Sequence, residues 1–137
     1  MPISGFDHVA LPTSHPEEML AFYEGLGFVA PDFQEWRKSG TPFFPVGIGS
    51  QKINFHAPSL WQNPDFELRG PSAKPGCGDL CFVWRGDSAS LQSALEGVGA
   101  AVIAGPVVLQ GARGTGTSIY IRDPDANLLE FIVYDEE

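Results

Sequence analysis

The sequence is poor in cysteine, in basic residues and in long hydrophobic runs, and each shortage excludes a class of protein. Its 137 residues include two cysteines, Cys77 and Cys81, whose number and spacing fit neither a disulfide framework nor a zinc knuckle. Eight Lys and Arg against 17 Asp and Glu give a net charge of -9, which disfavours nucleic acid as a partner. No apolar run approaches the ~18 residues of a membrane-spanning helix, and no signal-peptide pattern opens the chain. We therefore expect a cytoplasmic protein with reduced cysteines.

Charged residues are scarce as well, at 18% of the chain against ~25% in typical soluble proteins. Hydrophobic residues reach 43%, which excludes an intrinsically disordered chain. The length fits a single domain, 1–137, because domains most often contain roughly 100–150 residues. With 16 glycines and 12 prolines the chain must turn often, which favours many short elements and strands in particular.

A repeated helix pattern divides the chain into two halves. Apolar residues recur at the first, fourth, fifth and eighth positions of segments 19–26 and 91–98, as on one face of a short amphipathic helix. A glycine follows each segment, Gly27 and Gly99, where a helix is expected to end. The two segments begin 72 residues apart, which predicts a duplicated module.

Each predicted helix lies among predicted strands. The strand-like runs are 6–11, 28–36, 42–48 and 51–57 in the first half, and 79–84, 101–109, 116–122 and 128–134 in the second. Module 1 spans about 4–57, module 2 about 79–134, and the Pro- and Gly-rich segment 58–78 links them. One module cannot bury both faces of its own sheet. We therefore predict an α+β fold in which paired βαβββ modules form a curved, mostly antiparallel eight-stranded sheet around a concave site.

Several short signals mark where these elements should begin or turn. Ser14 and Glu17 have the spacing of a capping box, and Asp87 or Ser88 can cap the second helix. Gly49-Ser50 suits a two-residue hairpin loop, and the run Asp123–Asn127 consists of residues that favour a turn.

Strand alternation places polar side chains on the sheet face that the helices do not cover. Those side chains are His8, His56, Asp79 and Glu130, with Asn54 two residues before His56. The repeat pairs His8 with Asp79 at an offset of 71, and His56 with Glu130 at an offset of 74. Each residue alone is more often packed or solvated than functional, so their joint placement carries the prediction. Two imidazoles and two carboxylates favour a divalent metal ion (Zn, Fe, Mn, Ni or Co), and the sequence does not choose among these.

Other side chains on this face are candidates for contact with a substrate. They are Asn54, Cys81, Tyr120 and Arg122; Arg113 and Tyr134 are further possibilities. A surface or packing role is an equally simple interpretation of each.

Four strings in the sequence resemble the glyoxalase/bleomycin-resistance/dioxygenase (vicinal oxygen chelate) superfamily. They are FDHVALPTSHPEEMLAFYEGLGF, KINFHAP, GDLCFVW and SIYIRDPDANLLEF, and the resemblance covers residues 4–134. The small glyoxalase-like branch described as virulence-protein-like is the most similar. The resemblance implies paired βαβββ modules, a metal on the concave sheet, a small-molecule substrate and a homodimer.

Carried over position by position, the resemblance makes His8 the first-strand histidine ligand and Glu130 the last-strand glutamate ligand. His56 lies on the strand that supplies a glutamate in glyoxalase I, with Asn54 as the neighbouring alternative. Asp79 stands where many members have a histidine, which argues against classical glyoxalase I chemistry. Ala126 replaces the usual glycine of D-P-D-G-N, at some cost in strain if its φ is positive.

Three functions follow from these residues. The leading hypothesis is a metal-dependent glyoxalase-type lyase or isomerase, in which the metal chelates two neighbouring substrate oxygens and Glu130 or Asp79 moves a proton. The second is an Fe(II) ring-cleaving dioxygenase that uses His8, His56 and Glu130 as a two-histidine, one-carboxylate set. The third is a non-catalytic protein that sequesters a ligand, as bleomycin-resistance members do.

Overall fold

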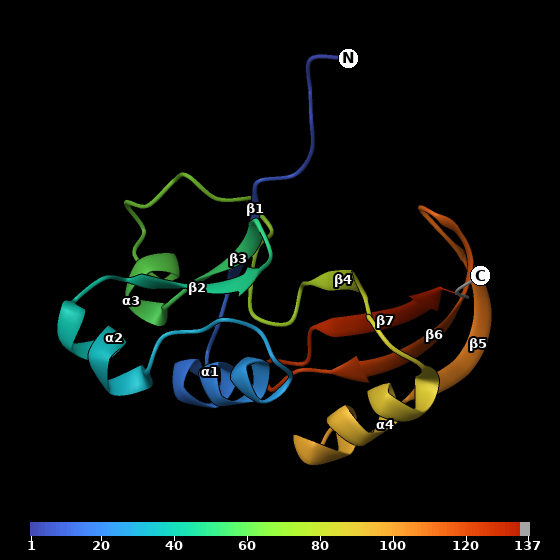
Figure 1. The fold of residues 1–137 in the computed structure, drawn as a ribbon. Helices are drawn as coiled ribbons and strands as arrows, with labels where there is room; N and C mark the ends of the chain where they lie inside the picture. Colours follow the sequence, from blue (N-terminus) through green and yellow to red (C-terminus); the bar gives the residue numbers. More distant parts are fainter. Residues whose placement is uncertain (135–137) are drawn as a thin grey trace.

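The computed structural model describes residues 1–134 as two modules, each of which sets helices against a mixed sheet (Figure 1). The elements of the first module are β1 (His8–Pro12), α1 (Pro16–Gly25), α2 (Phe33–Ser39), β2 (Phe43–Ile48) and β3 (Gln51–His56). The linker opens with the short helix α3 (Pro58–Trp61). The elements of the second module are β4 (Asp79–Val83), α4 (Ser88–Gly97), β5 (Ala104–Gly111), β6 (Gly114–Arg122) and β7 (Leu128–Tyr134).

The two sheets repeat one topology. In the first, the strand order is β1-β3-β2, and in the second it is β4-β7-β6-β5. The first strand of each module runs parallel to the last, and the other pairs are antiparallel. Helices α1 and α4 lie on the same side of the two sheets, the lower side in Figure 1. No helix among residues 1–134 has the length and hydrophobicity needed to cross a membrane. The mixed α+β character and the duplication are as predicted.

The predicted strand 28–36 is wrong, and residues 1–134 therefore contain seven strands, not eight, in two separate sheets. The only strand pairing described for this segment is one isolated antiparallel β-bridge between Val29 and Gly47. Helix α2 follows instead: the Asp32 side chain accepts a hydrogen bond from the Glu35 backbone N–H, and Gly40 ends the helix with φ of 74°. The capping signals at the two ends of this helix thus prevail over the strand-like composition of segment 28–36.

Of the other cap and turn predictions, the cap of α4 and the turn at Gly49 are confirmed, and the capping box at Ser14 is wrong. Of the two predicted caps of α4, Asp87 takes the role, since it accepts a hydrogen bond from the Ser90 backbone N–H at 2.8 Å. The capping box at Ser14 is absent: α1 has His15 at its N-cap position and no side-chain cap. Gly49 adopts φ of 56° in the β2–β3 hairpin, as a tight turn there requires.

One hydrophobic core runs through both modules, and buried polar groups join them. Phe28 packs edge-on against Phe82 with ring centroids 5.1 Å apart, and both rings lie against the buried cluster. The turn between β6 and β7 contributes the polar contacts. Within it, Asp125 accepts hydrogen bonds from the Thr13 hydroxyl and from the Ser14 backbone N–H, the latter at 2.9 Å. This explains the missing cap, because Ser14 is held by the second module. The single domain, 1–137, stays a prediction, and its residues 135–137 lie outside the described part of the chain.

Candidate functional site

Strand alternation puts the expected side chains on the face away from the helices. In β3, Ile53 and Phe55 are buried in the core, and Lys52, Asn54 and His56 alternate with them on the opposite face. In β7, Leu129 and Phe131 are buried, and Glu130 alternates with them. The polar residues singled out in the sequence therefore do lie on the uncovered sheet face.

Glu130 is the centre of a polar group in the second sheet. The strand register places it between Cys81 of β4 and Tyr120 of β6. Its Oε2 accepts a hydrogen bond of 2.6 Å from the hydroxyl of Ser118, which is fully buried. Ser118 was not among the sequence candidates, although its alternation with Ile119 on the same strand as Tyr120 assigns it to this face. Ser118 thus fixes the orientation of the carboxylate.

The Glu130 carboxylate alters the acidity of its neighbours. Burial, followed by the charge and hydrogen-bonding of Glu130 and the charge of Asp79, raises the pKa of the Cys81 thiol to about 11. Burial and Glu130 likewise raise the pKa of Tyr120. Cys81 and Tyr120 therefore remain protonated at neutral pH, and they can donate hydrogen bonds toward a carboxylate or a bound oxygen.

The first sheet contributes an imidazole and an amide. His8 begins β1, its side chain is 45% exposed, and its Nδ1 lies 2.7 Å from Oδ1 of Asp7. Asn54 lies on β3 opposite Ala10. Its Oδ1 is buried and has no hydrogen-bond partner among the described residues. A buried carbonyl oxygen without a donor is costly, so this oxygen is available to a ligand or a cation.

The register corrects the pairing inferred from the sequence. His8 is opposite Lys52, whereas His56 is opposite Pro12, four residues farther along. At ~3.3 Å per residue this separates the two positions by about 13 Å along the strands. In the second module Asp79 is opposite Leu128 and Glu130 opposite Cys81, so Asn54, and not His56, is the counterpart of Glu130, at an offset of 76.

His56 lies instead beside aromatic residues near the linker. Its ring centroid is 5.5 Å from that of Phe66 and 6.5 Å from that of Phe43. Burial and then the nearby Arg69 guanidinium lower the pKa of His56. The imidazole is therefore neutral at physiological pH, as a metal ligand must be, but it lies away from His8.

A cavity of about 300 Å³ separates β1 from β4 where His8, Asp79 and Cys81 lie. The edges of the two modules are close at the other end of β1, since a Cβ added to Gly78 would lie 2.9 Å from Leu11 Cδ1. No three His, Cys, Asp or Glu side chains within residues 1–134 form a ready metal cluster. One copy of the chain thus brings His8 and Asp79 to one cavity and keeps Glu130 on the adjoining strand, without assembling the four predicted ligands.

Arg122 lies at the end of β6, where its guanidinium donates a hydrogen bond of 3.1 Å to the Ala126 carbonyl oxygen. It is opposite Leu128 and therefore two residues from the Tyr120–Glu130 pair. The structure places it at the border of the candidate site.

The side chains on this face are of the types that bind divalent cations. They include an imidazole, two carboxylates and the unpartnered Asn54 oxygen, a mixture of nitrogen and oxygen donors used by Zn, Fe, Mn, Co and Ni, and of these His8 and Asp79 line the cavity. Cys81 and Tyr120 add protonated donors next to Glu130. Such a site can polarise substrate oxygens and move protons.

Comparisons with known proteins find relatives along nearly the whole chain. No family model matches the chain. Virulence protein STM3117 of Salmonella typhimurium is 38% identical over 135 residues, covering 98% of this chain and 87% of that protein. The glyoxalase domain-containing protein RDO1 of Mycosarcoma maydis is 35% identical over 134 residues, covering 98% and 70%. An integron cassette protein of V. cholerae superposes with a TM-score of 0.81 at 33% identity, covering 98% of each chain.

More distant structures share the fold alone. A lactoylglutathione lyase from Agrobacterium tumefaciens superposes with a TM-score of 0.69 at 21% identity, covering 96% of this chain and 95% of that one. The bleomycin resistance determinant of transposon Tn5 gives 0.59 at 21% identity, covering 97% and 100%.

Proposed function

Because the chain belongs to the glyoxalase/bleomycin-resistance/dioxygenase (vicinal oxygen chelate) superfamily, we propose that it is a metal-dependent lyase or isomerase. Its substrate would be a small molecule that offers two neighbouring oxygens, from a carbonyl and a hydroxyl group. The metal would be held by His8, Asp79 and Glu130 together with the side-chain oxygen of Asn54. This set replaces His56 by Asn54 because the strand register makes Asn54 the counterpart of Glu130.

The buried Asn54 Oδ1 is the observation that carries the proposal. It faces the same side of the sheet as His8 and has no donor among residues 1–134. A protein seldom leaves a buried acceptor without a partner, and such groups are often found where a ligand or an ion binds.

The chain's own residues have distinct tasks in this reaction. A bound divalent cation would supply Lewis acidity to the substrate oxygens. Glu130 is the principal proton carrier, since Ser118 holds its carboxylate in one orientation. Asp79, exposed beside the cavity, is the second carboxylate for this task. Tyr120 and Cys81, both protonated at neutral pH, donate hydrogen bonds to the substrate.

Metal content tests the proposal directly. Wild-type protein is expected to bind about one equivalent of Zn, Mn, Ni, Co or Fe per chain and to gain thermal stability with that metal, because a ligand that binds only the folded state raises the melting temperature. His8→Ala and Glu130→Gln should abolish both effects. His15→Ala is the matched control, since His15 is exposed at the start of α1. If the first two variants fold and retain full metal content, the proposed ligand set is wrong.

A ring-cleaving Fe(II) enzyme is less well supported by this geometry. Its two-histidine set requires His8 and His56 at one metal, and the register separates them along the strands. Oxygen uptake by the iron-loaded protein across a catechol panel would favour it over the lyase.

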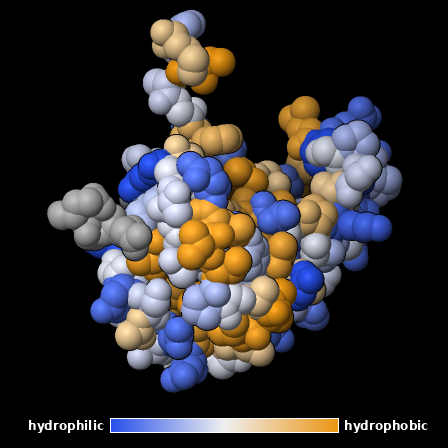
Figure 2. All heavy atoms as spheres, turned by 90° about the vertical axis from the view of Figure 1, so that its right-hand side faces the viewer, coloured by the Kyte–Doolittle hydropathy of each residue, from blue (hydrophilic) through white to orange (hydrophobic). Residues whose placement is uncertain are grey.

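We also propose that the protein is a cytoplasmic homodimer. The outer strand β5 is exposed along nearly its whole length and carries the apolar residues Val107, Val108 and Leu109. β5 lies on the right of Figure 1 and so faces the viewer in Figure 2, where hydrophobic side chains gather on this side of the molecule. An exposed apolar edge is a natural surface for a second copy. Light scattering should give the mass of a dimer, and Val108→Lys should reduce it to that of a monomer.

A further inference from the structure

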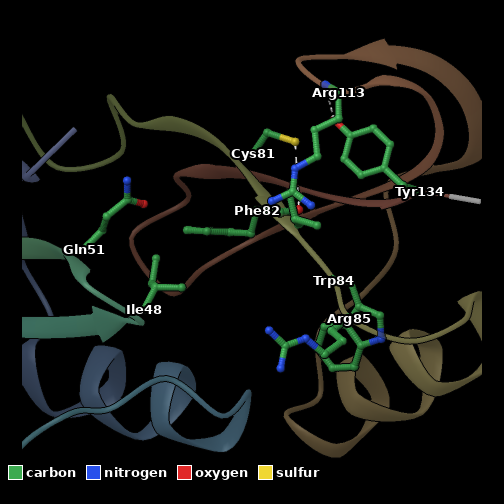
Figure 3. A pocket seen from close by; sticks show the side chains of 9 residues that line it. Ile48, Gln51, Cys81, Phe82, Trp84, Arg85, Arg113 and Tyr134 are labelled. Carbon is green, nitrogen blue, oxygen red and sulfur yellow. Dashed lines mark hydrogen bonds between the residues drawn. The ribbon is translucent and has the colours of Figure 1, made fainter. Parts of the chain in front are cut away.

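A second cavity lies beside the candidate metal site and differs from it in charge. It encloses about 460 Å³ and is bordered by Cys81, Trp84, Arg85, Arg113 and Tyr134, with Ile48 and Gln51 of the β2–β3 hairpin across from them (Figure 3). Its volume is in the range of pockets that take small molecules, ~300–1,000 Å³. Cys81 also borders the cavity at His8 and Asp79, so the two spaces meet at this residue.

Two of the eight basic residues of this acidic chain line the cavity, and no Asp or Glu does so among residues 1–134. No carboxylate of the described part of the chain pairs with either Arg85 or Arg113. A cavity that gathers two guanidinium groups in a protein of net charge -9 is a strong local exception to the overall charge.

Arg113 is held in place by Tyr134. The Arg113 backbone N–H donates a hydrogen bond of 3.1 Å to the Tyr134 hydroxyl, and the guanidinium carbon lies 5.6 Å from the centre of the Tyr134 ring. Gly111 makes this possible, because a Cβ at that position would lie 2.2 Å from the Tyr134 hydroxyl. The β5–β6 hairpin therefore presents a positioned guanidinium at the rim of the cavity.

Aliphatic and aromatic side chains form much of the remaining lining. Ile48, Phe82 and Val83 border the space, and Trp84 adds an indole ring whose Nε1 already donates to the Ser90 hydroxyl at 3.0 Å. The indole therefore offers its ring, and not its N–H, to a ligand. A guanidinium group can bind a carboxylate or a phosphate through two parallel N–H···O hydrogen bonds. The apolar wall of the cavity suits a hydrocarbon or aromatic group.

We infer that this cavity binds an organic anion, with its carboxylate or phosphate group at Arg85 and Arg113 and its apolar part against Trp84 and Ile48. The inference rests on the proposed function in one respect: the bound anion would be the substrate of that reaction. Its charged end would lie in this cavity, and its neighbouring oxygens would extend past Cys81 to the metal site. Binding of the anion itself requires no metal.

Titration of metal-free protein tests the inference. The protein is stripped with a chelator, freed of it by gel filtration, and titrated in Tris buffer with phenylphosphonate, benzoate and the uncharged benzyl alcohol. The Trp84 indole N–H signal in NMR spectra reports binding in the cavity. Phenylphosphonate or benzoate is expected to bind at least tenfold more tightly than benzyl alcohol, and more weakly as salt is added.

Variants locate the site. Arg85→Gln and Arg113→Gln should each weaken binding of the preferred anion about tenfold, the usual effect of losing one charge-assisted hydrogen bond near the surface. Arg113→Lys should retain part of the affinity because it keeps the charge. Arg37→Gln, on exposed helix α2, is the charge-matched control and should bind as wild type does.

Several results would overturn the inference: equal affinity for benzyl alcohol, wild-type affinity in both arginine variants, or an equal loss in Arg37→Gln. The outcome is separable from that of the proposed function. His8→Ala should lose metal and keep anion binding, whereas Arg113→Gln should weaken anion binding and keep metal.

Discussion

The Tyr23 hydroxyl donates a hydrogen bond of 2.7 Å to Oδ2 of Asp123, across 100 residues of sequence. Tyr23 is fully buried in α1, and Asp123 is 5% exposed in the turn before β7. Asn127 Nδ2 donates to the same oxygen at 2.8 Å. This one carboxylate therefore connects the helix of the first module with the turn of the second.

Removing the Tyr23 hydroxyl should destabilise the whole domain. Tyr23→Phe keeps the ring packing and deletes a donor to a buried carboxylate, so we expect a loss of about 1–3 kcal/mol in the free energy of unfolding. Urea denaturation measures it. A double-mutant cycle with Asp123→Asn is the control, and additive losses would show that the two side chains do not interact.

Cys81 should resist alkylation. With a pKa of about 11, only about one thiol in a thousand is ionised at pH 8, and the thiolate is the reactive form. In a Cys77→Ser background, the iodoacetamide reaction rate should be half-maximal near pH 11. Glu130→Gln should move that midpoint to lower pH, because the Glu130 charge is one of the causes of the shift. A midpoint near pH 8.5 in the variant that retains Glu130 would contradict the raised pKa of Cys81.

His56 should titrate below pH 6.5 in metal-free protein. Its lowered pKa means that the unfolded chain binds the proton more readily than the folded one. The stabilisation from this group is therefore present above pH 6.5 and is lost as the pH falls through the folded pKa. NMR titration measures the pKa. Arg69→Gln should raise it part of the way only, since burial is the larger cause; a pKa at or above 6.5 in the wild type would refute this.

Ala126→Gly should stabilise the protein. Ala126 is exposed and has φ of 72°, in the left-handed region that costs a residue with a Cβ ~1–2 kcal/mol. Glycine removes this strain and adds unfolded-chain entropy, so the net gain is about 0.5–1 kcal/mol. Ala89→Gly, at an exposed position of α4, is the control, and chemical denaturation should show a loss there of about 1 kcal/mol.

The sequence predicts well which face of a sheet a side chain occupies. It predicts poorly which residues of two neighbouring strands lie opposite each other. Alternation assigns Asn54, His56 and Glu130 to the uncovered side of their sheets, because side-chain direction is a local property of a strand. Which of them stands beside β1 or β4 depends on the parallel register, and that register is set by distant packing. The sequence repeat pairs His56 with Glu130 and leaves Asn54 as the neighbouring alternative, whereas the pairing of Pro12 with His56 places His56 at the end of β3 away from His8.

The error at 28–36 has a different origin. Asp32, Glu35 and Gly40 carry a cap, an acidic third position and a terminating glycine, so the signal for α2 was present in the sequence. The basic cavity was not foreseeable in this way. Arg85 and Arg113 lie in different segments after β4 and after β5, and only the tertiary structure brings them to one space.

The hydrogen bonds of the β6–β7 turn also bear on how the chain folds during its synthesis. Tyr23, Thr13 and Ser14 leave the ribosome about a hundred residues before Asp123 and Asp125 do. The first module therefore stays incompletely packed, with these polar groups still hydrated, until the β6–β7 turn has emerged. Until then the nascent N-terminal half is exposed to chaperones and proteases.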